Sequence, residues 1–152
     1  MRNVCAIFAA LTTILVVASS DAVADASKYG KQKVVYHINY NGGQDDKAYR
    51  GAMRNTQNHI NAVGEENLEV KVVLHENGVN LLKSAVGNQK LQSQVTNLKT
   101  QDVNFHVCNN TLVGRKIDYE NDLFEVFDDM IVPSGVAELS YLQQQGYTYI
   151  KP

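Results

Sequence analysis

The sequence predicts an α/β protein, a three-layer α/β/α sandwich with a mainly parallel sheet of four or five strands. Past residue 25, short runs rich in β-branched and aromatic residues alternate with segments whose apolar residues recur at helical spacing. Strands that alternate with helices favour right-handed crossovers, which make the strands parallel and cover both faces of the sheet. This pattern leaves the order of the strands open.

The first 24 residues have the layout of a secretory signal peptide (1–24). Arg2 gives a short positive region, residues 4–18 are apolar, and Ala24 and Ala26 offer small-residue cleavage sites. The apolar run is short for a permanent membrane anchor, which is the alternative interpretation. We therefore expect a mature chain of one domain, residues 25–152, in the periplasm or secreted.

The charge of the chain argues against two classes of partner. The formal net charge is only −2, and the leader contributes one base and one acid to it. So small a charge predicts no nucleic-acid partner and no electrostatic attraction to anionic membranes. Because no later apolar stretch is long enough to span a bilayer, we expect no membrane association after leader cleavage.

The first half of the domain is predicted to contain two strands and three helices. Residues 33–40 (KVVYHINY) have strand composition and end at an Asn-Gly-Gly breaker. Residues 45–63 have helical spacing, with two aspartates in the expected first turn and a glycine after the end. Residues 68–75 (LEVKVVLH) form the second strand, and short helices are expected over 79–86 and 91–98.

The second half is predicted to repeat this alternation. Residues 103–108 (VNFHVC) form the third strand, and a helix is expected to start within 111–115. The segment 122–130 alternates acidic with apolar residues and is either helical or irregular. The C-terminal elements are a strand at 130–132, a helix within 133–146 and a strand at 147–151.

Small polar residues follow each predicted strand. Because open parallel sheets bind ligands outside the carboxyl ends of their strands, we expect a site there. Cys108 ends the third strand and is the candidate catalytic residue. The candidate substrate-binding residues are Asn39, Asn41, His75, Asn77, Asn110 and Arg115.

Cys108 is the only cysteine of the predicted mature chain, since Cys5 lies in the leader. Exported proteins usually pair their cysteines, so an odd one indicates intermolecular pairing or a reactive thiol, or else a buried, inert one. A helix is expected directly after it, with Asn110 or Thr111 as the cap. The positive end of that helix, and Arg115 unless it is simply solvated, would favour the thiolate, which attacks sulfane sulfur or a disulfide.

Three histidines, His37, His75 and His106, lie in or at the ends of strands, and His106 shares a face with Cys108. They would suit zinc or copper if they met, but none has the spacing of a preassembled site, so we predict ordinary hydrogen bonds and no metal. His75 and Glu76 are possible acid–base partners of Cys108, although Glu76 also suits a solvated turn. Neither a dinucleotide fingerprint nor a P-loop is present, so we predict no cofactor.

Three segments carry a resemblance to a known family: CNNTLVGR (108–115), HENGVNLL (75–82) and the C-terminal segment 132–152. Together they make nearly the whole mature chain resemble the DsrE/DsrF-like sulfur-transfer family, which is related to the TusD-type sulfur-relay subunits. The resemblance implies a flavodoxin-like fold, assembly into trimers or hexamers, and a cysteine that carries sulfur as a persulfide. By position that residue is Cys108, and its partner would be a sulfane-sulfur donor or acceptor.

The leading hypothesis is therefore an exported sulfur carrier or sulfurtransferase-like protein. The alternative is a non-catalytic, oligomeric protein of the same fold that binds a small ligand or metal at the same strand ends. A flavodoxin-like electron carrier has the least support, because no flavin motif is present.

Overall fold

The computed structural model describes residues 28–152, so the predicted signal peptide (1–24) lies outside the described residues. A five-stranded sheet with the order β4-β3-β2-β1-β5 forms its centre, and every pair of neighbouring strands is parallel. The strands are β1 (Gln32–Ile38), β2 (Leu68–Leu74), β3 (Asn104–Cys108), β4 (Ile131–Val132) and β5 (Thr148–Ile150). The predicted parallel α/β sheet is confirmed, with the larger of the two expected strand numbers.

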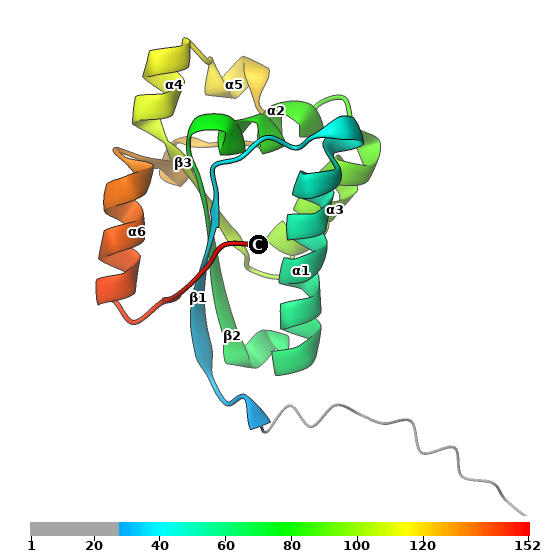
Figure 1. The fold of residues 1–152 in the computed structure, drawn as a ribbon, viewed down its shortest axis with the longest axis vertical. Helices are drawn as coiled ribbons and strands as arrows, with labels where there is room; N and C mark the ends of the chain where they lie inside the picture. The colour runs from blue at the N-terminus through cyan, green and yellow to red at the C-terminus, as the bar shows by residue number, and fades with distance from the viewer. Residues whose placement is uncertain (1–27) are drawn as a thin grey trace, which may run out of the picture.

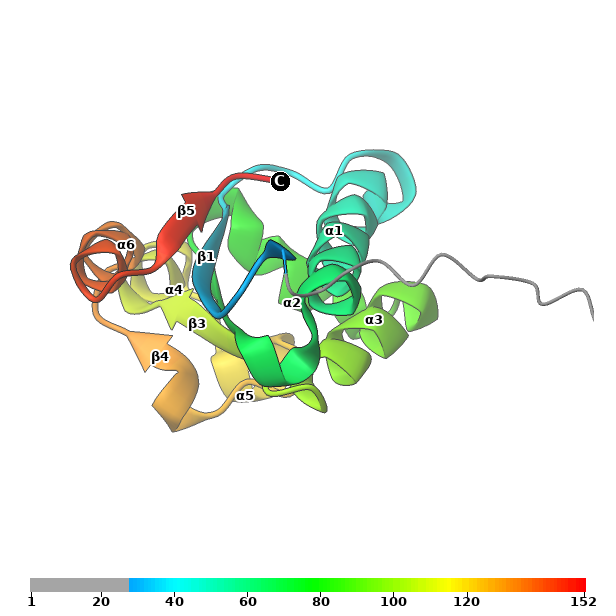
Figure 2. The same cartoon turned by 90° about the horizontal axis from the view of Figure 1, so that it is seen from below.

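Helices cover both faces of this sheet, so the molecule has three layers (Figures 1 and 2). The helices are α1 (Lys47–Val63), α2 (Asn80–Ala85), α3 (Gln89–Lys99), α4 (Asn109–Arg115), α5 (Tyr119–Asp122) and α6 (Gly135–Gln144). Figure 2 shows α1 and α3 on one side of the strands and α6 on the other. In Figure 1, α4 and α5 lie beyond the carboxyl end of the sheet. The expected three-layer, flavodoxin-like architecture is thus confirmed.

The two faces of the sheet differ in composition because successive side chains of a strand point to opposite sides. Toward α1 and α3, β1 and β2 contribute Val34, Tyr36, Ile38, Val70, Val72 and Leu74 to one large apolar cluster. Toward α6, the cluster contains only Val35, Val73, Leu139, Leu142 and Tyr147. Toward the carboxyl ends of the strands the α6 face also carries histidines and Cys108, as described below, and toward their other ends it carries polar residues such as Lys33, Glu69 and Lys71.

The start of α1 differs from the prediction. Asp45 and Asp46 do not occupy its first turn but form a short 3₁₀ turn with Gln44, with left-handed backbone angles (φ 51° and 55°). Aspartate tolerates this conformation better than most residues because its short polar side chain can bond locally. The carboxylate of Asp46 also accepts a hydrogen bond from Nδ2 of Asn88 at 2.9 Å, which ties this turn to the start of α3.

The segment between α4 and α6 is mostly irregular, which settles the choice left open for 122–130. The single turn α5 ends at Asp122, and a short 3₁₀ turn at Asp128–Met130 leads into the two-residue strand β4. This route places Val132 of β4 beside Cys108 of β3 in the parallel register. The start of α6 therefore lies next to the end of β3.

One glycine fixes the turn that follows β2. A Cβ at Gly78 would lie 1.8 Å from the carbonyl oxygen of Ile38, so only glycine lets this turn approach the end of β1. The amide of Gly78 also bonds the carbonyl of His75 at 2.9 Å. Together these contacts hold His75 and Glu76 at the carboxyl end of the sheet.

Within residues 28–152, none of the helices has the length and apolar character needed to cross a bilayer.

Candidate functional site

A cavity of about 400 Å³ opens at the carboxyl ends of β2 and β3. The turn after β2, the helix α4 and the start of α6 together form its walls. Its lining residues are His75, Glu76, Cys108, Asn110, Thr111, Gly114, Arg115, Ser134 and Val136. It therefore contains a thiol, an imidazole, a carboxylate and a guanidinium, which is more chemical variety than the other hollows of the described chain offer.

Cys108 lies on the wall of this cavity with only 5% of its surface exposed. It is the last residue of β3 and also the N-cap position of α4, with extended backbone angles. The expected cap, Asn110 or Thr111, is therefore wrong. The strand runs into the helix without an intervening turn, so Asn109 and Asn110 already lie in the first helical turn.

Four hydrogen-bond donors around Cys108 favour its anion. Burial raises the pKa of the thiol, but the Gly135 amide, the Thr111 hydroxyl and the amides of Thr111 and Asn110 outweigh it. The net pKa of Cys108 therefore lies below its ordinary value, because all these donors favour the thiolate. The Thr111 hydroxyl is oriented for this role, since its oxygen accepts a hydrogen bond from the Glu76 amide at 2.9 Å.

Two helix starts thus converge on one thiol. The donors from Thr111 and Asn110 belong to the first turn of α4, and Gly135 is the first residue of α6. Ser134 caps α6 by accepting a hydrogen bond from the Ala137 amide at 3.4 Å. The sequence predicted both helices but connected only the start of α4 with the thiol. The missing information was the adjacency of β3 and β4, which no local pattern contains.

Arg115 lines the same cavity but interacts mainly with its neighbour. Its Nη2 donates to Oδ1 of Asn77 at 2.9 Å. The groups that lower the pKa of Cys108 are the hydrogen-bond donors around the sulfur, and the Arg115 charge is not among them. Asn77 therefore positions Arg115 from outside the cavity lining. Of the two alternatives for Arg115, a solvated side chain fits the structure better than a direct partner of the thiolate.

Asn39 and Asn41 are not brought to this cavity. In the sheet, β2 separates β1 from β3, so the end of β1 lies two strands away from Cys108. Beyond Ile38 the chain turns toward α1, where Gly42 lies against the ring of Tyr49. Of the predicted binding residues, the lining includes His75, Asn110 and Arg115. A binding role for the two asparagines after β1 stays an untested prediction.

The strand histidines make ordinary hydrogen bonds, as predicted. Nε2 of His37 lies 2.6 Å from Nε2 of His75, and Nδ1 of His37 lies 2.6 Å from the Tyr149 hydroxyl. His106 shares the α6 face with Cys108 as expected, but its Nδ1 bonds Glu138 of α6 at 2.8 Å. Among residues 28–152 no group of three or more histidine, cysteine or acidic side chains has the arrangement of a metal site.

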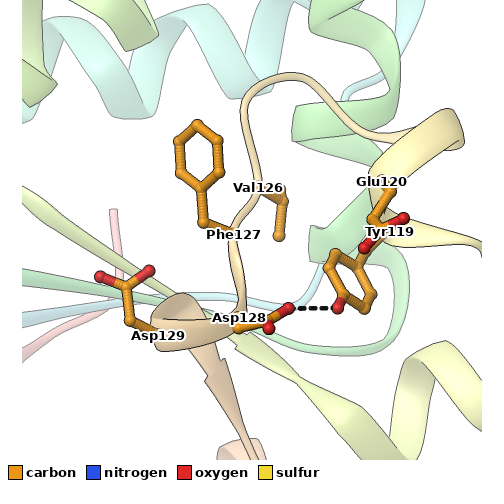
Figure 3. A pocket seen from close by; sticks show the side chains of 6 residues that line it. All are labelled: Tyr119, Glu120, Val126, Phe127, Asp128 and Asp129. Atoms are coloured by element: carbon orange, nitrogen blue, oxygen red, sulfur yellow. Dashed lines mark hydrogen bonds between the residues drawn. The ribbon is translucent and has the colours of Figure 1, made fainter.

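A second hollow, of about 450 Å³, lies over the irregular segment before β4. Figure 3 shows the Tyr119 hydroxyl bonded to Asp128, while the ring of Phe127 points away from this pair. The hydrogen bond to Asp128, followed by burial and nearby acidic charges, raises the pKa of Tyr119 to about 12. Because this hollow has no thiol, imidazole or basic lining residue, Cys108 and its cavity are the better candidate site.

Comparison with known proteins identifies the family. The sequence matches the DsrE/DsrF-like family over residues 32–152, a segment that contains the whole sheet and the Cys108 cavity. The chain belongs to the DsrE/DsrF-like family. For this DsrE/DsrF-like protein, membership suggests a function related to sulfur relay. The relation to TusD-type subunits and the export of the chain stay predictions.

A solved structure supports the fold. The chain resembles MTH1491, a protein of unknown function from Methanobacterium thermoautotrophicum, with a TM-score of 0.67 and 30% sequence identity. The similarity covers 80% of this chain and 100% of that one. A comparison with curated proteins returned no match.

Proposed function

We propose that this DsrE/DsrF-like protein is an exported sulfur carrier, or a sulfurtransferase-like protein, that binds sulfane sulfur as a persulfide on Cys108. The observation that supports this proposal is the set of four hydrogen-bond donors around a thiol on a cavity wall. The same amides that favour the thiolate also suit the anionic outer sulfur of a persulfide, since both are anions near helix starts.

The proposed step needs no external oxidant. The Cys108 thiolate attacks the sulfane sulfur of a persulfide donor, a new bond forms to Sγ, and the S–S bond of the donor breaks. Its electron pair leaves on the donor thiolate. Overall, a thiol and a persulfide exchange one sulfur atom, and transfer to an acceptor is the reverse process with a different thiol.

The burial of Cys108 fits a thiol in an oxidising compartment. With 5% of its surface exposed, Cys108 is largely buried in the wall of the cavity. A protein-sized thiol or disulfide cannot approach such a sulfur without a narrow, protruding terminus, which limits intermolecular disulfide formation. We therefore expect small persulfides, or a partner protein with an extended donor segment, as the sulfane-sulfur donor or acceptor. A homotrimer or homohexamer, which the family resemblance implies, belongs to the same proposal.

The test uses the full chain with Cys5→Ser, so that Cys108 is the sole thiol, and treats it with inorganic polysulfide. We expect intact mass to increase by one sulfur atom, and dithiothreitol to reverse the increase. The matched control carries Cys108→Ser as well and should take up no sulfur. A parent protein that gains no mass, or a control that gains the same mass, contradicts the proposal.

The alternative function, a non-catalytic binding protein, is favoured by the burial of the same cysteine. It predicts that iodoacetamide labels folded Cys108 slowly at neutral pH, and that unfolding restores the rate. The sulfur-carrier proposal instead predicts labelling with a midpoint below the pH of about 8.5 that is typical of a free thiol. The labelling rate over a pH series distinguishes the two functions.

A further inference from the structure

A hydrogen-bonded chain of three side chains connects the Cys108 cavity with the outside of the sheet. It begins at His75 on the cavity wall, continues through His37 of β1 and ends at Tyr149 of β5. Both contacts measure 2.6 Å. The two imidazoles are 7% and 8% exposed, whereas Tyr149 is 40% exposed. The inner end of the chain is thus buried beside the site and the outer end reaches solvent.

The contact between the two imidazoles requires a shared proton. The ring planes are nearly parallel (14°) and their centroids lie 4.7 Å apart. Face-to-face stacking would keep the nitrogens about 3.5 Å apart, so an Nε2-to-Nε2 separation of 2.6 Å means that the rings meet edge to edge. One Nε2 must therefore carry a hydrogen and donate, and the other must accept. The choice at this contact fixes the proton at Nδ1 of His37, and hence whether Tyr149 donates or accepts. The three side chains therefore have two alternative proton arrangements.

His75 is placed to pass a proton to the contents of the cavity. Its ring lies under Gly135, whose added Cβ would come within 2.8 Å of the His75 Cβ. The amide of that same Gly135 is one of the donors that lower the pKa of Cys108. Among the hydrogen bonds of residues 28–152, none uses Nδ1 of His75. This nitrogen is therefore available to a group bound beside the thiol.

Burial and nearby charges lower the pKa of both histidines, so both rings are neutral near pH 7. Burial, then the charge of His75 and that of Lys151, lower the pKa of His37 to about 4, against a smaller opposing effect of Glu76. Burial, together with Lys151, also lowers the pKa of His75 despite the opposing charge of Glu76. A neutral imidazole donates a proton readily only if another proton replaces it at its second nitrogen. The chain to Tyr149 offers that replacement.

We propose that His75, His37 and Tyr149 form a proton relay that protonates the leaving thiolate in the reaction of Cys108. This inference deepens the proposed function and rests on the thiol chemistry of the same cavity. When Sγ attacks and the S–S bond breaks, the leaving sulfur takes the proton from Nδ1 of His75. Nε2 of His75 takes one from His37, and Nδ1 of His37 takes one from the Tyr149 hydroxyl.

The proton balance closes through solvent. Tyr149 regains its hydrogen from water, and the hydroxide so formed takes the proton that Cys108 released as it became a thiolate. Neither imidazole becomes an anion, Tyr149 is a phenolate only until water reprotonates it, and no oxidant or reductant is used. In the reverse direction, the relay removes the proton from an attacking thiol, and the two proton arrangements of the chain exchange.

The experiment measures exchange of Cys108 with two small disulfides in the full chain carrying Cys5→Ser. One disulfide releases the acidic thiol 5-thio-2-nitrobenzoate, which leaves without a proton, and the other releases the basic thiol 2-mercaptoethanol. In His75→Phe, His37→Phe and Tyr149→Phe we expect the rate with the basic leaving group to fall about tenfold or more. This is less than the roughly 10²–10⁴-fold typical of general acids, because thiolates leave readily. The rate with the acidic leaving group should change less than about twofold.

The matched controls are His59→Phe and Tyr141→Phe, which change the same residue types outside the chain. His59 bonds Tyr36 and Gln32, and Tyr141 is an exposed residue of α6. Both controls should keep the parent ratio of the two rates. Equal slowing with both disulfides in the relay variants overturns the relay, as does a parent protein that reacts with neither disulfide. Because this readout needs no persulfide, a protein that fails to gain sulfur from polysulfide yet shows the leaving-group effect refutes only the sulfur-carrier proposal.

Discussion

The two faces of the central sheet are built for different purposes. Toward α1 and α3, the buried residues of β1 and β2 are apolar or aromatic and join a single cluster that also includes α2, and Gln32 at the start of β1 bonds His59 of α1. Toward α6, alternate positions hold Val35 and Val73, but the next residues along the strands are His37 and His75. On this face His37 and His75 bond each other, and His106 bonds Glu138 of α6. The first face therefore provides most of the apolar burial, and the second face, with the shorter helix, holds the candidate site.

The same substitution on both faces tests whether they differ in their contribution to stability. Leu91 of α3 is fully buried in the large cluster, whereas Leu139 of α6 retains 8% of its surface beside the small cluster. Leu→Ala substitutions in cores cost about 2–5 kcal/mol, and the cost is larger where the surroundings cannot relax. We expect Leu91→Ala to lower the free energy of unfolding by about 4 kcal/mol, and Leu139→Ala by about 2 kcal/mol.

Urea unfolding followed by circular dichroism measures both values. The Cys108 labelling rate, measured on the folded variants, gives the second half of the comparison. Leu139→Ala should change the labelling rate because α6 carries the Gly135 amide, and Leu91→Ala should leave it unchanged. The division between the faces is wrong if both variants are equally destabilised. It is also wrong if the Cys108 labelling rate changes only in Leu91→Ala.

The pH dependence of stability should reflect the burial of His37 on the α6 face. Its pKa of about 4 in the folded protein lies below the ordinary value of 6.5, so the unfolded chain binds this proton at higher pH. Stability is therefore complete above about pH 6.5 and is lost as the pH falls toward about 4. We expect a loss of about 2 kcal/mol from His37, less than the full conversion of the shift, because solvent screens a site near the end of the sheet.

The control for this prediction is His59 on the α1 side of the sheet. Its pKa is lowered by burial alone, without a second histidine beside it. The unfolding free energy should therefore become less dependent on pH between about 4 and 6.5 in His37→Phe than in His59→Phe. If both variants keep the full pH dependence of the parent, the histidine pair is not the acid-sensitive element.

Sequence reasoning found what local patterns encode. The composition of residues 33–40 and 68–75 identified two strands, and the position of Cys108 at a strand end identified the candidate site. The order of the strands was out of reach, because it depends on how the crossovers pack and β4 has only two residues. Without that order, the role of Gly135 at the thiol was not predictable. Nor was the contact of His37 with Tyr149, which lies 112 positions away in the sequence.

The smallest expected loss of stability comes from removing the N-cap of one helix on each face of the sheet. Asn88 caps α3 by accepting from the Leu91 amide at 3.3 Å, and Ser134 caps α6 by accepting from the Ala137 amide at 3.4 Å. Loss of such a cap typically costs about 0.5–2 kcal/mol, and because both bonds are long we expect about 0.5–1 kcal/mol for Asn88→Ala and for Ser134→Ala.

The two cap variants should differ in the pKa of the thiol. Ser134 precedes Gly135, so fraying at the start of α6 moves the Gly135 N–H away from Cys108. With this donor weakened, burial raises the pKa of the thiol. In iodoacetamide labelling, we expect the midpoint of Ser134→Ala to move to higher pH by a few tenths of a unit, and that of Asn88→Ala to stay at the parent value. A midpoint that moves equally in both variants would mean that general loosening, and not the start of α6, controls the thiolate. Because Asn88→Ala also removes the hydrogen bond to Asp46, it should lose at least as much stability as Ser134→Ala. A midpoint that moves only in Ser134→Ala therefore shows that the α6 face is specialised for holding this anion.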